Sequence, residues 1–99
     1  MISRHWWGLA RAAFAEAYEE HLQSETFPAI RKLPGFVSAS ILRRSVPEGV
    51  EFLIVTNWLS VEAIRAFAGP NAETAVVPQK VQDMMVDYER TVRHYEVVA

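Results

Sequence analysis

Apolar and polar positions repeat with two different periods along the chain, which predicts short strands and amphipathic helices. Segment 2–9 is rich in aromatic and apolar residues, as is typical of a strand. In segment 10–24 the apolar residues recur every three or four positions, so they form one face of a helix. We expect a break near Thr26, because Pro28 lacks the N–H group that a helix interior needs. A short helical piece should follow and end at Pro34–Gly35.

The middle of the chain predicts a hairpin followed by a helix. Segments 36–46 and 50–59 read as strands, and Pro47–Glu48–Gly49 between them is a turn sequence. Ser60 is a good N-cap for a helix over 61–68, since its hydroxyl can accept from a free N–H of the first turn. A strand-turn-strand-helix unit is therefore expected here.

The last third predicts one more helix and one more strand. Pro78 can open a short helix, and its apolar stripe would be Val81, Met84, Met85 and Tyr88. Residues 90–98 then read as the final strand. The order is β-α-β-β-α-β, a ferredoxin-like topology in which right-handed crossovers place both helical connections on one face of a four-stranded antiparallel sheet. We predict a single α+β domain over residues 1–99.

The predicted strands are apolar on both sides, so the sheet needs two covers. In segment 50–59 one face is apolar, and the opposite face is apolar as well, through Leu53, Val55 and Leu59. The first and last strands share this property. Because the chain supplies helices for only one face, we predict a twofold homodimer that joins the other faces of two sheets.

The composition of the chain argues against several classes of function. The chain has 99 residues, a formal net charge of −2 and no cysteine. There is thus no disulfide, thiolate nucleophile or cysteine-based zinc site, and no basic face for nucleic acid. No apolar run approaches the ~20 residues that span a bilayer, so we expect no membrane partner. The N-terminal residues lack the apolar core of a signal peptide, which makes a cytoplasmic location the default expectation.

Several short segments form a pattern along almost the whole chain. They are Arg4-x-Trp6-x-Gly8, Leu33-Pro-Gly-Phe36, Glu51 to Ser60 with Trp58, Glu62 to Gly69 with Phe67, Glu73 to Pro78, and Val92 to Val97 with His94. In their order and spacing they resemble the antibiotic biosynthesis monooxygenase-like group of dimeric α/β-barrel proteins. The resemblance implies a ferredoxin-like subunit, sheets packed back to back in a dimer, and a small-molecule pocket between the sheet and the helices.

The same resemblance implies a choice of chemistries. Members of the group include cofactor-free oxygenases of quinol or polyketide-type aromatics, haem-degrading enzymes and isomerases of small carbonyl compounds. Haem-degrading relatives carry a tryptophan where Phe67 stands and an axial histidine near Val77, and several quinol-type relatives carry a histidine at Phe67. Since this chain has neither residue type there, we expect no haem and no other cofactor.

The candidate catalytic residues are His94, His5 and Asn57. If segments 1–9 and 90–98 pair as antiparallel neighbours, His5 and His94 come close, where two imidazoles could move a proton or hold an oxyanion. The alternative is two strand histidines bonded to backbone or interface groups. They have no third ligand for a metal, so no metal site is expected. Asn57 could donate to a substrate oxygen or satisfy the dimer interface.

The candidate substrate-binding residues are mainly aromatic or cationic: Trp58, Trp6, Arg43, His21 and Phe67. Trp6 and Trp7 should point to opposite faces, and Trp58 could equally be core packing. Arg43 and Arg44 are alternatively solvated or paired with Glu51 across the hairpin.

The sequence therefore predicts a cofactor-independent monooxygenase-like protein that acts on a small phenolic or quinol-type aromatic. A basic group would remove a phenolic proton, and the electron-rich substrate would then react with oxygen. The alternatives are a non-catalytic dimer that binds a ligand or partner, and an isomerase or cyclase of the same fold.

Overall fold

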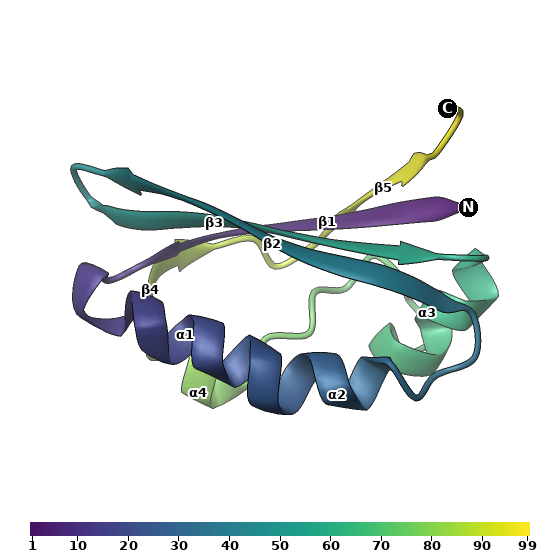
Figure 1. Ribbon diagram of the computed structural model, residues 1–99, viewed down its shortest axis with the longest axis horizontal. Coiled ribbons are helices and arrows are strands. Elements are labelled where there is room, and N and C mark those ends of the chain that lie inside the picture. Colours follow the sequence, from purple (N-terminus) through teal and green to yellow (C-terminus); the bar gives the residue numbers. More distant parts are fainter.

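The computed structural model describes residues 1–99. Its strands all pair antiparallel and form one sheet (Figure 1). The strands are β1 (Ile2–Ala10), β2 (Phe36–Val46), β3 (Gly49–Trp58), β4 (Met85–Tyr88) and β5 (Arg93–Glu96). Their order is β2-β3-β1-β4, and β5 also pairs with β1. The predicted α+β, ferredoxin-like architecture is confirmed, but the sheet has five strands where four were predicted, because β4 precedes the segment 90–98 in which β5 lies.

The helices all lie against one face of this sheet, and the opposite face is bare (Figure 1). They are a 3-10 turn (Ala12–Phe14), α1 (Ala15–His21), a π-helical segment (Leu22–Thr26), α2 (Phe27–Ile30), α3 (Val61–Ala68) and α4 (Gln79–Gln82). The one-sided helical cover predicted from right-handed crossovers is thus confirmed. No helix is long and apolar enough to cross a membrane.

The expected break near Thr26 is instead a change of helical type. Residues Leu22–Thr26 form a π-helical segment, and the N–H of Phe27 donates to the carbonyl of Leu22, five residues back. The wider turn accommodates Pro28, which has no N–H to donate and would crowd the preceding turn of a regular α-helix. The helical rod therefore continues through the proline instead of stopping before it.

The predicted helix through Tyr88 is wrong in its second half. α4 ends at Gln82, and Met85–Tyr88 is strand β4, in which Tyr88 pairs with Gly8 of β1. A short apolar run does not distinguish a strand from a helix by spacing alone. Here the tertiary pairing determines that the segment is a strand, because β4 supplies hydrogen-bond partners to the free edge of β1.

Local sequence signals in the middle of the chain were sufficient to predict the β2–β3 hairpin and the start of α3. The Ser60 hydroxyl accepts from the N–H of Ala63 at 3.2 Å and so caps α3, as predicted. Gly35 has φ +87°, a conformation that L side chains rarely adopt, where the chain turns into β2. Across the hairpin Arg44 Nε lies 3.0 Å from a Glu51 carboxylate oxygen, which confirms the alternative reading of this arginine.

The register of β1 on β3 shows which side chains lie on each face of the sheet. Trp6 lies opposite Ile54 on the helical side, whereas Trp7 lies opposite Leu53 on the bare side. The opposite orientation of the two tryptophans is therefore confirmed. The core on the helical side contains four large side chains that are fully buried: Trp58, Phe52, Ile30 and Ile64.

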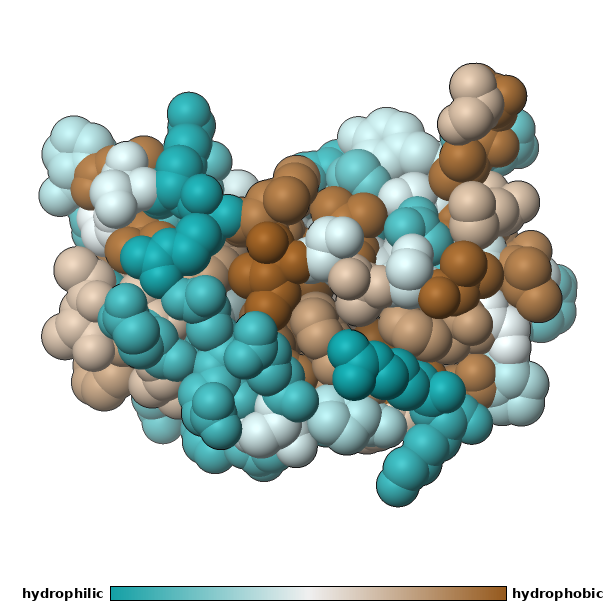
Figure 2. All heavy atoms as spheres, in the orientation of Figure 1, coloured by the Kyte–Doolittle hydropathy of each residue, from teal (hydrophilic) through white to brown (hydrophobic).

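The bare face carries exposed apolar groups. Leu42 is 51% exposed and Tyr95 is 50% exposed, both in strands whose other face is covered. Figure 2 shows brown apolar side chains at the surface along the sheet layer, beside teal polar clusters. The homodimer that would cover this face remains a prediction.

Candidate functional site

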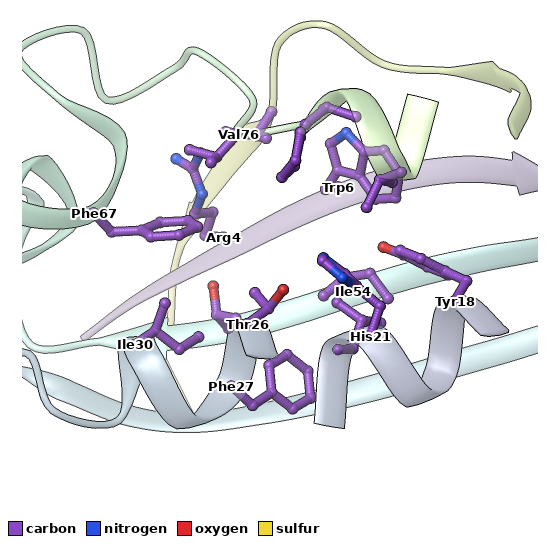
Figure 3. A pocket seen from close by; sticks show the side chains of 16 residues that line it. Arg4, Trp6, Tyr18, His21, Thr26, Phe27, Ile30, Ile54, Phe67 and Val76 are labelled. Carbon is purple, nitrogen blue, oxygen red and sulfur yellow. The ribbon is translucent and has the colours of Figure 1, made fainter. Parts of the chain in front are cut away.

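A pocket opens between the sheet and its helical cover (Figure 3). Its floor is the sheet, its wall is the α1 to α2 rod, and its roof comes from α3, α4 and the segment between them. The residues used below are Arg4, Trp6 and Thr56 of the floor, Tyr18, His21 and Thr26 of the wall, and Phe67, Val76 and Val77 of the roof. The position of the pocket is the one that the resemblance implied.

The pocket has a cavity volume of about 70 Å³, and about 580 Å³ of non-atom space lies within its outline when the open mouth is included. The cavity volume is smaller than that of the ~150 Å³ cavity known to hold a benzene ring. A small ring would therefore lie partly in the mouth or widen the pocket. Most of the lining is hydrophobic, as in sites that bind small organic molecules.

Aromatic rings form the end of the pocket opposite Arg4 (Figure 3). A side chain at position 8 would overlap the Trp6 ring, since a Cβ there would lie 2.4 Å from it. Gly8 thus lets Trp6 lie flat along the sheet. The Trp6 Nε1–H donates to the carbonyl of Glu89 at 2.8 Å, and the Tyr18 ring is 6.1 Å from Trp6. Both rings are held by packing or bonding before any ligand arrives.

Arg4 is the main polar group of the floor, and sequence reasoning missed it. Its side chain is only 5% exposed. Its Nη1 donates to the carbonyl of Ala72 and to His94 Nε2, the latter at 3.1 Å, and its Nη2 donates to the carbonyl of Thr74 at 2.8 Å. These three bonds hold the roof segment and leave two of the five guanidinium donors, the Nε–H and one N–H of Nη2, without a protein partner. No side-chain polar atom without a partner is fully buried, so the Nε–H is at least partly exposed, and Arg4 lines the pocket.

The charge of Arg4 has no carboxylate partner. All its hydrogen-bond acceptors are neutral, and the guanidinium lies 5.6 Å from the centre of the Phe67 ring, which stacks in turn on Trp58 at 6.1 Å. Burial lowers the pKa of Arg4 to about 10, so the group stays cationic at neutral pH. A buried cation without a counter-ion favours an anionic ligand.

The helical wall presents His21 to the pocket. His21 is 7% exposed, and its Nδ1 lies 3.2 Å from Glu25 Oε2. Lys80 of α4 donates to the same oxygen at 2.8 Å. These hydrogen bonds, the one from Lys80 first, lower the pKa of Glu25. The hydroxyl of Tyr18 is a further polar group on this wall, and burial raises the pKa of Tyr18, so it remains a neutral donor.

The structure separates the two histidines that the sequence suggested as a pair. In the register of β5 on β1, His94 lies opposite Arg4 and His5 lies opposite Arg93. His94 therefore points to the helical side and His5 to the bare side, because neighbouring strand positions alternate faces. Their expected proximity is wrong. Burial, with repulsion from a nearby arginine second, lowers the pKa of both histidines.

The remaining candidates divide between the pocket and other places. Trp6, His21 and Phe67 line the pocket, and Trp58 is completely buried behind Phe67. Asn57 lies on the bare face and donates to Ser38 at 3.0 Å. Arg43 lies at the outer end of the sheet, where it pairs with Glu19 of α1. Asn57 and Arg43 do not reach the pocket within one subunit.

No three histidine, aspartate or glutamate side chains gather in the structure in a way that could hold a metal ion.

The floor residue Arg4 could have been found from the sequence, because strand alternation puts it on the same face as Trp6. Tyr18 and His21 share the helical stripe. The partners of these groups, by contrast, come from distant segments that no local pattern connects.

Together, the fold and the pocket define a class: a ferredoxin-like α+β domain with a small, mostly apolar ligand site between sheet and helices. Solved structures with this fold cover the whole chain. The haem degrader MhuD of Mycobacterium tuberculosis, solved with two haems in its active site, is 21% identical over 100% of this chain and 97% of its own, with a TM-score of 0.69.

Two further structures carry monooxygenase names. A Bacillus cereus protein with the provisional name antibiotic biosynthesis monooxygenase is 19% identical over 99% of this chain and 91% of its own, with a TM-score of 0.68. The ActVA-Orf6 monooxygenase of Streptomyces coelicolor, in complex with nanaomycin D, is 17% identical over 99% and 87%, with a TM-score of 0.66. The fold of the antibiotic biosynthesis monooxygenase-like group, inferred from the sequence, is confirmed.

Comparison by sequence gives no match: neither a protein-family model nor a curated protein matches this chain.

The residues of the pocket argue against haem. Phe67 and Val77, at the positions where the resemblance implies a tryptophan and an axial histidine, both line it.

Proposed function

We propose that this protein is a cofactor-free, monooxygenase-like protein that binds a small phenolic or quinol-type aromatic compound between its sheet and its helices. The observation that carries the proposal is the buried guanidinium of Arg4, which has no acidic partner, has N–H groups that no protein atom accepts, and lines an apolar pocket. A phenolate oxygen would supply the missing negative charge, and the apolar walls would bury the ring.

The distribution of polar groups supports a flat ligand with oxygen atoms at opposite edges. Arg4 and Phe67 lie at one end of the pocket, Tyr18 and Trp6 lie at the other, and His21 and Thr26 reach in from the helical side (Figure 3). Aromatic rings at both ends offer stacking surfaces. A quinol places one oxygen near the cation and leaves the second for a hydroxyl or imidazole group.

The reaction would follow from the electronics of the ligand. Pairing with Arg4 stabilises the phenolate, which is far more electron-rich than the phenol and so more readily oxidised by oxygen. An isomerase or cyclase would use the same deprotonation without consuming oxygen, and a binding protein would stop at the complex. The inward position of Arg4 and His21 favours the catalytic alternatives.

We also propose that two copies join through the bare faces of their sheets. Leu42, Leu53 and Trp7 lie on that face, where covering them with a second copy removes apolar surface from water. The pocket lies on the other side of the sheet, so each subunit would keep its own ligand site open.

The experiment is an anaerobic titration with 1,4-naphthohydroquinone, followed by measurement of oxygen consumption in air. Losing a charge-assisted hydrogen bond costs about 1.5–3 kcal/mol, so Arg4→Met should weaken binding ~10- to 150-fold. Arg43→Met is the matched control, because Arg43 lies outside the pocket. Equal affinity of the wild type and Arg4→Met would contradict the proposal. Binding without oxygen uptake would favour the isomerase or the non-catalytic alternative.

A further inference from the structure

His21 combines deep burial with a ring nitrogen that has no protein partner. Its Nδ1 is bonded to Glu25 at 3.2 Å, but no hydrogen bond reaches its Nε2. Because no unbonded polar side-chain atom is fully buried, Nε2 is at least partly exposed. It is therefore the ring nitrogen that is free to meet a ligand in the pocket that His21 lines. Figure 3 shows the ring projecting from α1 toward the sheet, between Thr26 and Tyr18.

The partner of each histidine fixes where its proton lies. Glu25 is a carboxylate and only accepts, so Nδ1 of His21 carries the hydrogen and neutral His21 has a free lone pair on Nε2. His94 shows the converse arrangement. The Arg4 guanidinium only donates, so the His94 Nε2 lone pair is already engaged at 3.1 Å. Of the two histidines on the helical side, only His21 offers a basic atom to the pocket.

We propose that His21 is the general base of this pocket and that Glu25 is its positioning residue. This inference rests on the phenolic ligand proposed above. In the step, the O–H bond of the bound phenol breaks, its proton bonds to His21 Nε2, and the electron pair remains on the oxygen. The products are a phenolate, next to Arg4, and an imidazolium, next to Glu25. No oxidant or metal takes part in this transfer.

The surrounding charges favour the transfer. Among the residues that line the pocket, the titratable ones besides His21 are Arg4 from β1 and Tyr18 from α1. Arg4 attracts the new phenolate, and Tyr18 stays neutral and can donate to it. Outside the pocket Glu25 stabilises the imidazolium, whereas Lys80 of α4 shares its Oε2 atom and moderates that effect. Both ions formed by the transfer thus find an opposite charge.

The tautomer can be tested without any ligand. A long-range proton–nitrogen correlation spectrum of the wild-type protein should show His21 with a protonated Nδ1 and an unprotonated Nε2. Glu25→Gln should reduce the preference for this tautomer, because an amide can both donate and accept. A spectrum with the proton of neutral His21 on Nε2 would overturn the proposal.

The proton transfer can be tested with 4-nitrophenol, whose phenolate absorbs at longer wavelength than the phenol. His21→Gln should raise the pH at which the bound probe ionises by about 1 unit or more, because the neighbouring cation is lost. Glu25→Gln should raise it by less. His5→Gln, on the opposite face, is the matched control and should behave as the wild type.

The outcomes separate the two proposals. If the wild type does not bind the probe, the phenolic pocket is refuted, and the assignment of the base fails with it. If the wild type and His21→Gln bind the probe and ionise it at the same pH, the pocket stands and only the role of His21 is refuted.

Discussion

Placing a charge on the bare sheet face should dissociate the proposed dimer, and Leu42→Lys is the sharpest way to do so. Leu42 lies opposite Leu53 on that face and is 51% exposed in the single subunit. Full burial of a leucine side chain contributes about 1.5–3 kcal/mol. The exposed half therefore has about 1 kcal/mol still to gain from a partner.

Twofold symmetry doubles this effect, since each subunit contributes the same residue to the interface. Leu42→Lys should thus weaken the dimer by about 2 kcal/mol, which is ~30-fold in the dissociation constant. The cost of removing an ammonium group from water adds to this value. Folding of the subunit should change little, because the substituted side chain lies outside the helical core.

Sedimentation velocity over a series of protein concentrations measures the effect. Phe14→Lys is the matched control: Phe14 is 42% exposed but belongs to the helical layer, so the wild-type dissociation constant is expected. A wild-type protein that sediments as a monomer at all accessible concentrations would refute the reasoning. So would a Leu42→Lys variant that associates as tightly as the wild type.

Three further predictions concern stability. Burial, then repulsion from a nearby arginine, lowers the pKa of His94 in the folded state, so stability should fall as the pH drops below ~6.5, where the unfolded chain takes up the proton. Urea midpoints should show a smaller fall for His94→Gln, and an equal fall would contradict this cause. Ser60→Ala removes the α3 cap and should cost ~1 kcal/mol in urea unfolding; an unchanged midpoint would show that the cap contributes nothing. Gly35→Ala should lower the melting temperature, because Gly35 has φ +87° and the new Cβ would lie 2.5 Å from that of Ala63; an unaltered melting curve would exclude strain there.

Those parts of the fold that depend on local chemistry could be predicted from the sequence. The β2–β3 hairpin and the cap at Ser60 follow from turn and capping residues, and both lie where expected. The identity of β4 could not be predicted, because Met85–Tyr88 becomes a strand only where the edge of β1 needs partners. Non-local pairing overrides a weak local pattern there.

The expected proximity of His5 and His94 failed for a related reason. Pairing His5 with His94 required the register of two distant strands, and a shift of one residue moves a side chain to the other face. Arg4 was overlooked because its acceptors at Ala72 and Thr74 come from a loop without regular structure. His21 was found as a pocket residue, but its importance depends on Glu25, whose position follows from the π-helical segment.

That π-helical segment makes the length of the rod critical. It contains one residue more than an α-helix needs over the same rise, so it has the form of a one-residue insertion between His21 and Phe27. Deleting a single residue from it would restore α-helical geometry and turn everything downstream by about 100°. Phe27 and Ile30 would then leave the sheet, and Pro28 would meet the preceding turn. A single-codon deletion here should harm the protein far more than most single substitutions in the same segment.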